Sequence, residues 1–283
     1  MQKCQISKHR LFLLDVLRII CALLIYLRHS IGMYGCTYGY NLDKLFVNMT
    51  TPVMTCFFIL SGFSIHYQHK SEKMNALWVR RYLKKRFISI MPSYLLVAII
   101  WPLAYPAQAR DWVLLLPIDL FGVQTSYRTL FGLLHNGGTW FVSCMLLAYI
   151  IYPIIKSILE TEKKWITIAF IIIPHFLLMY SNVIISKFNL DGLYSNPIAR
   201  TAEFTIGVGF AQLVFRKNIY ASATSSNKLR FFLKNKVGTQ YCIIVFLIFL
   251  SLILSGVNHS DKKTVVFNYL VIPAMLIILL VST

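Results

Sequence analysis

Apolar residues occur in long blocks along this chain, and not at alternate positions or as one-sided helical stripes. A block of about 20 apolar residues is long enough to cross a bilayer as a helix. Eight blocks reach or approach this length, at residues 11–31, 46–67, 87–105, 139–158, 165–181, 198–215, 239–256 and 265–282. The pattern therefore predicts an all-α, polytopic transmembrane helix bundle with about eight spans.

The segment 111–134, between the third and fourth blocks, is apolar but interrupted. Pro117, Asp119, Gly122 and Arg128 break it up, which is compatible with a segment that lies in the membrane interface or re-enters the bilayer. No internal repeat and no long polar stretch separates the blocks. We therefore expect a single integral-membrane domain over residues 1–283.

The composition agrees with a membrane protein and changes the interpretation of the charge. Only 13% of the residues are charged, against roughly a quarter in ordinary soluble domains. The net charge of +18 is also typical of nucleic-acid binders, but those gather basic residues on one face of a soluble fold. Here the basic residues lie between apolar blocks, so we expect membrane lipid and no nucleic acid as a partner.

The distribution of basic residues predicts the orientation of the spans. The N-terminus and the segments 68–86, 156–164 and 216–236 together hold 19 Lys and Arg, whereas the alternate segments hold 6. Basic loops remain in the cytoplasm. We expect both termini to be cytoplasmic, in a cell inner or plasma membrane. Asp15 and Arg18 interrupt the first apolar block, so it is expected to be a retained helix and not a cleaved signal.

The six cysteines do not form a CxxC pair or a metal-ligand spacing. Cysteine in an apolar block behaves as a small hydrophobic residue. The sequence thus indicates neither a disulfide framework nor a metal site.

The first span, which contains LRIICALLIYLRHS, carries Arg18 and His29. They are eleven positions apart, so both lie on one helix face, separated by ~16 Å along the axis. An arginine at the centre of a membrane helix costs about 2.5–3.5 kcal/mol on insertion scales, which favours a polar cavity along this face. The alternative is that Arg18 pairs with Asp15, three residues earlier, and that His29 is an interfacial residue.

Two further groups of charged residues are candidates for a site. Arg200 and Glu203 are three positions apart and share a helix face; they are either a structural pair or part of the cavity that Arg18 lines. A basic run follows the second span and comprises Arg80, Arg81, Lys84, Lys85 and Arg86. Such a run either fixes the topology of the adjacent spans and attracts anionic lipid, or it binds a phosphorylated cytoplasmic molecule.

Five segments in order resemble the membrane acyltransferase-3 family: LDVLRIICALLIYLRHS, FFILSGF, RFISIMPSY, TWFVSCMLLAYIIYP and ARTAEFTIGVGFA. The resemblance covers about residues 10–215. It implies a transmembrane O-acyltransferase that moves an acyl group, usually acetyl, from cytoplasmic acyl-CoA to a hydroxyl of a surface polysaccharide or lipid-linked glycan. No bound cofactor is implied, since acyl-CoA is the donor substrate.

The same resemblance implies roles for individual residues. His29 would be the catalytic residue and Arg18 its partner. The basic residues before ISIMP, namely Arg80, Arg81, Lys85 and above all Arg86, would lie in the CoA region. Trp140, Arg200 and Glu203 match further motif positions, and Asp15 is a candidate cavity residue through Arg18. A histidine with an ordinary pKa near 6.5 can deprotonate a sugar hydroxyl.

Two features depart from the family pattern. Ser89 stands where the family often has a second arginine, and the chain stops after its eighth span, whereas the family has about ten. We therefore expect a short member without the family's last helices. The alternatives are an inactive truncated member and a transporter or flippase of a lipid-linked glycan, although the inverted repeats or broken helices of transporters are not visible.

Overall fold

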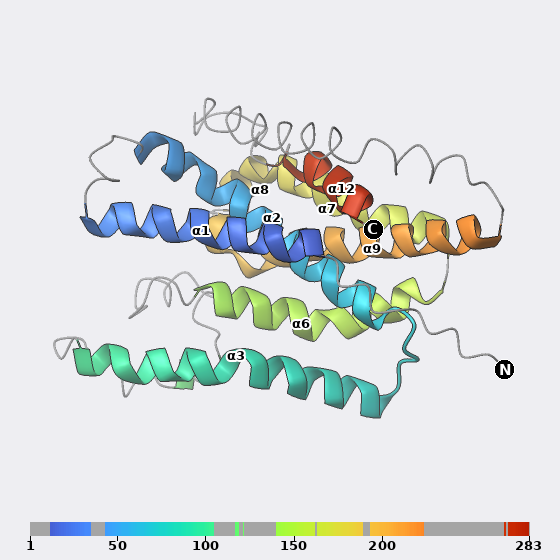
Figure 1. Cartoon of the computed structure of the whole chain (residues 1–283), viewed down its shortest axis with the longest axis horizontal. Coiled ribbons are helices and arrows are strands. Elements are labelled where there is room, and N and C mark those ends of the chain that lie inside the picture. Colours follow the sequence, from blue (N-terminus) through green and yellow to red (C-terminus); the bar gives the residue numbers. More distant parts are fainter. Residues whose placement is uncertain are drawn as a thin grey trace.

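In the computed structural model every regular element of the described residues is a helix (Figure 1). The structure describes residues 12–34, 43–104, 117–118, 121, 140–161, 163–188, 193–223, 269 and 271–282. The helices are α1 (Phe12–Tyr34), α2 (Asp43–His69), α3 (Ala76–Ala104), α6 (Trp140–Leu159), α7 (Lys164–Met179), α8 (Ser181–Phe188), the 3-10 helix η2 (Leu193–Ser195), α9 (Pro197–Ala223) and α12 (Val271–Ser282). The all-α prediction is confirmed for this part of the chain.

The predicted spans agree with the helices for the most part. Those at 11–31, 46–67, 139–158 and 165–181 fall on α1, α2, α6 and α7, and 198–215 lies within α9. The span at 265–282 corresponds to the shorter α12, and 239–256 lies outside the described residues. So does most of 111–134, of which only residues 117–118 and 121 are described.

The third span differs from the prediction because its helix begins early. Residues 76–86 were expected to connect two spans, yet they form the first turns of α3. Asn75 caps this helix, since its side-chain oxygen accepts a hydrogen bond from the backbone N–H of Trp78 at 2.7 Å. Lys and Arg are good helix formers, so the basic run continues the helix and does not interrupt it.

The long helices run roughly parallel or antiparallel to one another (Figure 1). α1 ends where α2, α6 and α9 begin, at the left of the view, and α2 ends where α3 begins, at the right. We call these ends the His29 end and the turn end. The alternation of direction is the one that the sequence predicts for successive spans.

α2 is the central helix, because it contributes to all three hydrophobic clusters of the core. Its residues pack with α1, α9 and α12 in one cluster, with α3, α6 and α9 in the second, and with α6 in the third. The approach of α2 to α9 is especially close at Gly62 and Gly207. A Cβ atom on Gly62 would overlap the carbonyl oxygen of Phe204, and one on Gly207 would overlap that of Ile59. Small residues of this kind let membrane helices approach closely.

We expect Gly62→Ala and Gly207→Ala to destabilise the protein, by about 1–3 kcal/mol or more, because backbone atoms cannot move aside as a side chain can. Gly209→Ala is the matched control. A Cβ atom there would meet a side-chain carbon of Ile171 at 3.0 Å and the backbone carbonyl oxygen of Thr167 at 3.3 Å, contacts that a shift of a few tenths of an ångström relieves. Thermal unfolding in detergent measures the difference, and an equal effect at all three glycines would contradict the close backbone contact.

Large apolar side chains cover the outer faces of several helices. The exposed ones include Ile19, Ile20 and Leu23 on α1, Phe87, Ile88, Leu96, Val97, Ile99 and Ile100 on α3, Ile150, Ile154 and Ile158 on α6, and Ile172, Ile173, Phe176 and Leu177 on α7. Soluble proteins rarely expose apolar surface on this scale. Among the described helices one, α6, is both long and apolar enough to cross a membrane.

Candidate active site

Arg18 makes hydrogen bonds within its own helix, α1, and to the neighbouring helix α2. Its Nη1 donates to Asp15 Oδ1 at 2.8 Å, and its Nη2 donates to the hydroxyl of Ser64 on α2. The Arg18 side chain is 36% exposed. The local pair with Asp15 is therefore present, as the simpler alternative predicted. The guanidinium is also tied to α2, and part of the side chain remains exposed.

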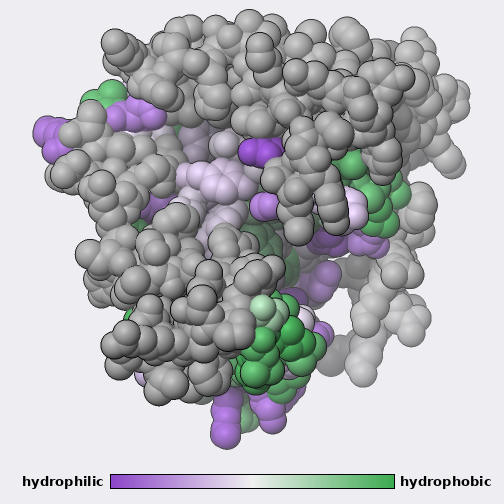
Figure 2. All heavy atoms as spheres, turned by 90° about the vertical axis from the view of Figure 1, so that its left-hand side faces the viewer, coloured by the Kyte–Doolittle hydropathy of each residue, from purple (hydrophilic) through white to green (hydrophobic). Residues whose placement is uncertain are grey.

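His29 lies on the same face of α1 as Arg18, in the last turns of the helix, and its side chain is exposed. Ile25, one turn earlier, packs against the cluster that contains Trp140 and Tyr194. This part of α1 therefore lies beside the beginning of α6 and the 3-10 helix before α9. Weakly polar side chains gather near the centre of this end of the bundle (Figure 2).

The start of α9 explains how Arg200 and Glu203 are placed. Asn196 caps the helix, because its side-chain oxygen accepts the backbone N–H groups of Ile198 at 2.9 Å and Ala199 at 3.3 Å. Pro197 occupies the first helical position, where a missing N–H costs nothing. Arg200 and Glu203 follow within the first two turns and are both fully buried.

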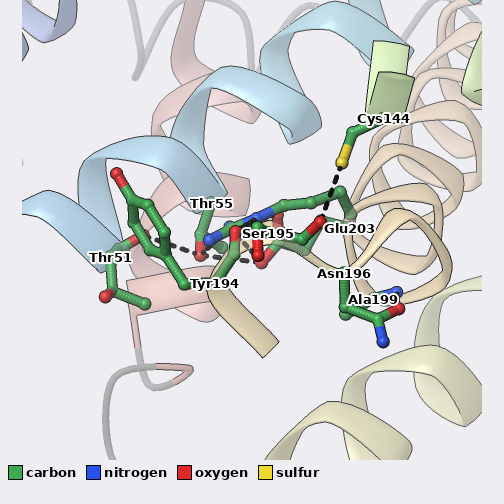
Figure 3. Close-up of polar contacts among 9 residues, drawn as sticks. Thr51, Thr55, Cys144, Tyr194, Ser195, Asn196, Ala199 and Glu203 are labelled. Carbon is green, nitrogen blue, oxygen red and sulfur yellow. Dashed lines mark hydrogen bonds and ion pairs between the residues drawn. The ribbon is translucent and has the colours of Figure 1, made fainter. Parts of the chain in front are cut away.

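Arg200 and Glu203 form an ion pair in which Arg200 Nη1 lies 2.8 Å from both carboxylate oxygens. Thr55 on α2 donates to Glu203 Oε1 at 2.9 Å (Figure 3), and Arg200 Nε donates to the carbonyl of Tyr194 at 2.9 Å. The guanidinium also lies over the rings of Phe58, Trp140 and Tyr194. We call these six residues the Arg200 cluster. It joins α2, α6 and α9 at the His29 end.

Arg18 and Arg200 contact α2 at different levels along its axis. Arg18 contacts α2 at Ser64, whereas Arg200 contacts it at Thr55. Nine residues of helix separate these positions, or about 14 Å. The complete burial of Arg200 and Glu203 is typical of a structural pair.

The basic run lies at the turn end. Arg80, Arg81, Lys84 and Lys85 are exposed, and Arg86 is partly buried. The Arg86 guanidinium lies over the rings of Tyr82 and Tyr149, at 5.5 and 5.7 Å, and its Nη2 lies 3.3 Å from His69 Nε2. The cations predicted for a CoA region are thus at the opposite end of the molecule from His29, at the end where Arg18 lies.

Two residues that the sequence analysis did not single out complete the surroundings of Arg86. His69 Nδ1 lies 3.0 Å from Glu72 Oε2, in the turn between α2 and α3. Burial lowers the pKa of His69, with Arg86 and Lys85 adding to the effect of burial and Glu72 opposing it. Partial burial raises the pKa of Glu72, but hydrogen bonds from Trp78 and His69 outweigh it, and the net shift is downward. At neutral pH the pair is therefore a neutral imidazole beside a carboxylate.

Lys156 lies at the end of the predicted span 139–158, although it was also counted with the basic segment 156–164. It lies within α6, as the span predicted, and is 1% exposed. Its ammonium donates to the backbone carbonyl of Glu72 at 2.8 Å and to Glu160 Oε1 at 2.6 Å. A lysine at the end of an apolar block was the available signal, since a charge placed there needs partners.

Comparison with known families identifies the class of protein. The family model described as an acyltransferase domain, that of acyltransferase-3, matches residues 12–283. The chain therefore belongs to the acyltransferase-3 family of membrane-associated acyltransferases. No curated protein and no solved structure matches it.

Proposed function

We propose that this acyltransferase is an integral membrane protein that transfers an acetyl group from cytoplasmic acetyl-CoA to a hydroxyl of a surface polysaccharide or lipid-linked glycan. The observation that carries the proposal is the geometry of α1. One face of this helix presents an exposed histidine at one end of the bundle and a half-exposed arginine near the other, where the basic start of α3 also lies.

The membrane placement rests on three features together. Apolar side chains cover the outer faces of four helices, the helices alternate in direction, and the exposed basic residues at the start of α3 lie at the turn end. We propose that the bundle crosses the inner or plasma membrane with the turn end and both termini in the cytoplasm. CoA then meets the basic run, and a surface glycan meets His29.

The reaction proposed at His29 is general base catalysis of acyl transfer. The imidazole accepts the proton of the acceptor hydroxyl as the oxygen attacks the thioester carbonyl carbon. The carbon–sulfur bond breaks, and the CoA thiolate takes the proton from the imidazolium, which returns to the neutral form. For the thioester to reach His29 while the phosphates remain with Arg86, the pantetheine arm must extend along α1 over the ~16 Å between Arg18 and His29.

The proposal is tested with acetyl-CoA that carries a labelled acetyl group. Inside-out membrane vesicles containing the full chain and the cell's own surface glycan should transfer the label to the glycan as an alkali-labile ester. Vesicles without the protein should not. If the full chain neither binds CoA nor acetylates any glycan, the enzyme proposal is wrong, and movement of a lipid-linked glycan across the vesicle membrane becomes the assay to run.

Arg18 allows a sharper test, because its pairing partner can be removed separately. If Arg18 acts on the donor, Arg18→Lys should lower acetylation about tenfold or more, since lysine cannot reproduce the two-directional contacts of the guanidinium. Asp15→Asn should lower it less than about fivefold, because a half-exposed ion pair contributes little. Quantitative mass spectrometry of the glycan measures both. Equal losses would show that Arg18 matters only through Asp15.

A further inference from the structure

The turn between α2 and α3 holds a chain of three polar groups that ends on Arg86. Glu72 Oε2 lies 3.0 Å from His69 Nδ1, and His69 Nε2 lies 3.3 Å from Arg86 Nη2. A carboxylate only accepts hydrogen bonds, and a guanidinium only donates them. The proton of a neutral His69 is therefore on Nδ1, directed at Glu72, and the Nε2 lone pair accepts a hydrogen bond from Arg86.

This chain is fixed to the rest of the bundle. The indole N–H of Trp78 donates to the same Glu72 oxygen that His69 contacts. The buried ammonium of Lys156, on α6, holds the backbone carbonyl of Glu72 at 2.8 Å. The turn is thus anchored to both α3 and α6, and it presents Nε2 of His69 at a defined place.

Arg86 itself has few other constraints. Its guanidinium lies over the rings of Tyr82 and Tyr149, at 5.5 and 5.7 Å, and among the described residues its buried Nε makes no hydrogen bond. Aromatic rings hold the plane of a guanidinium but do not fix its rotation within that plane. The contact with His69 supplies the missing direction.

We infer that His69 and Glu72 are positioning residues for the donor site, which hold Arg86 in the orientation that binds the phosphates of CoA. The inference rests on the proposed function, because it deepens the role proposed there for Arg86. Glu72 fixes the tautomer of His69, and His69 in turn orients the guanidinium. Neither residue needs to touch the donor.

The inference also specifies a pH dependence. Protonation places a second N–H on His69 and removes the acceptor for Arg86. The charges that face His69 are Glu72 from the turn and Arg86 and Lys85 from α3, while Lys156 of α6 acts on Glu72 and on the neighbouring His66. Burial lowers the pKa of His69 below its usual 6.5. Nε2 of His69 therefore accepts the hydrogen bond from Arg86 at neutral pH. It loses this capacity in acid, once the pH falls below the lowered pKa of His69.

The test measures the Kd of CoA for the purified full chain in lipid nanodiscs. An asparagine side chain reaches the position of Nδ1, and a glutamine side chain reaches that of Nε2. We therefore expect His69→Asn, which lacks the acceptor for Arg86, to weaken binding about 3- to 10-fold, and His69→Gln, which keeps one, to bind within about twofold of wild type. His175→Asn, a histidine on α7 that is half-buried, is the matched control and should bind as wild type. When the pH is lowered from 7.5 to 5.5, CoA binding by wild type should weaken more than CoA binding by His69→Gln.

Combination with Arg86→Ala separates positioning from a purely structural role. If His69 acts through Arg86, His69→Asn weakens CoA binding in the wild-type background and has no further effect when Arg86 is absent. Equal effects in both backgrounds, or stronger binding by wild type than by His69→Gln in acid, would overturn the inference and leave the proposed function standing. Failure of wild type itself to bind CoA would overturn the proposed donor and the inference with it.

Discussion

Replacement of His29 by alanine should abolish acetylation of the surface glycan. General base catalysis contributes about 10²–10⁴-fold to a rate, so the variant should fall to the level of cells without the protein. The His29 side chain is exposed, and truncation of an exposed side chain changes stability little. We therefore expect equal membrane abundance of the variant and wild type. The ester-linked acetyl content of the glycan, measured by NMR or mass spectrometry, gives the result.

A second histidine makes the comparison specific. His175→Ala removes the same chemical group from a different helix, α7, where the side chain is half-buried. Acetylation should persist in this variant. Normal acetylation by His29→Ala would show instead that His29 is an interfacial residue, as the simpler interpretation of the first span allows, and another base would have to be sought.

Short-range features of this site were predictable from sequence. The shared face of Arg18 and His29 follows from helical periodicity alone, and α1 is a continuous helix over both. The pairs Asp15–Arg18 and Arg200–Glu203 have the spacing of neighbours on a helix surface, and both pairs are present. In each case the partners lie within a single helix, so no knowledge of tertiary packing was needed.

Contacts between helices could not be predicted in this way. Thr55 lies 148 residues before Glu203 in the chain, and Ser64 lies 46 residues after Arg18. Hydropathy places each residue in a block but does not say which blocks pack together. The same limit applies to one of the two partners of Lys156, the backbone carbonyl at position 72, which lies 84 residues earlier in the chain.

The basic run shows a different limit. Counting charges predicts which side of the membrane a segment occupies, but it carries no information on whether that segment is helical. As the first turns of α3 the run holds its cations at fixed positions along an axis. Arg86 thereby comes within reach of His69, while Arg80, Arg81, Lys84 and Lys85 remain exposed. The helix separates one oriented cation from four that are free to attract phosphate or anionic lipid.

The largest effect on stability is expected at Glu203. Both members of the Arg200–Glu203 pair are fully buried, so Glu203→Ala leaves a guanidinium in the interior without its counter-charge. Loss of one partner of a buried pair costs about 3–5 kcal/mol. Asp15→Ala is a control with the same three-residue spacing, because it breaks a pair whose side chains are 36% and 43% exposed, and it should cost no more than about 1 kcal/mol.

A double variant decides what the buried pair is for. Apolar residues of similar volume can replace a buried ion pair without loss of stability, so Arg200→Met combined with Glu203→Leu should unfold near the wild-type temperature in detergent. If that protein also acetylates the glycan, Arg200 and Glu203 serve only to join α9 to α2. If it is stable but inactive, the pair contributes to the reaction, and the cage formed by Phe58, Trp140 and Tyr194 is then part of the site beside His29. Equal stability of Glu203→Ala and Asp15→Ala would contradict the burial on which both expectations depend.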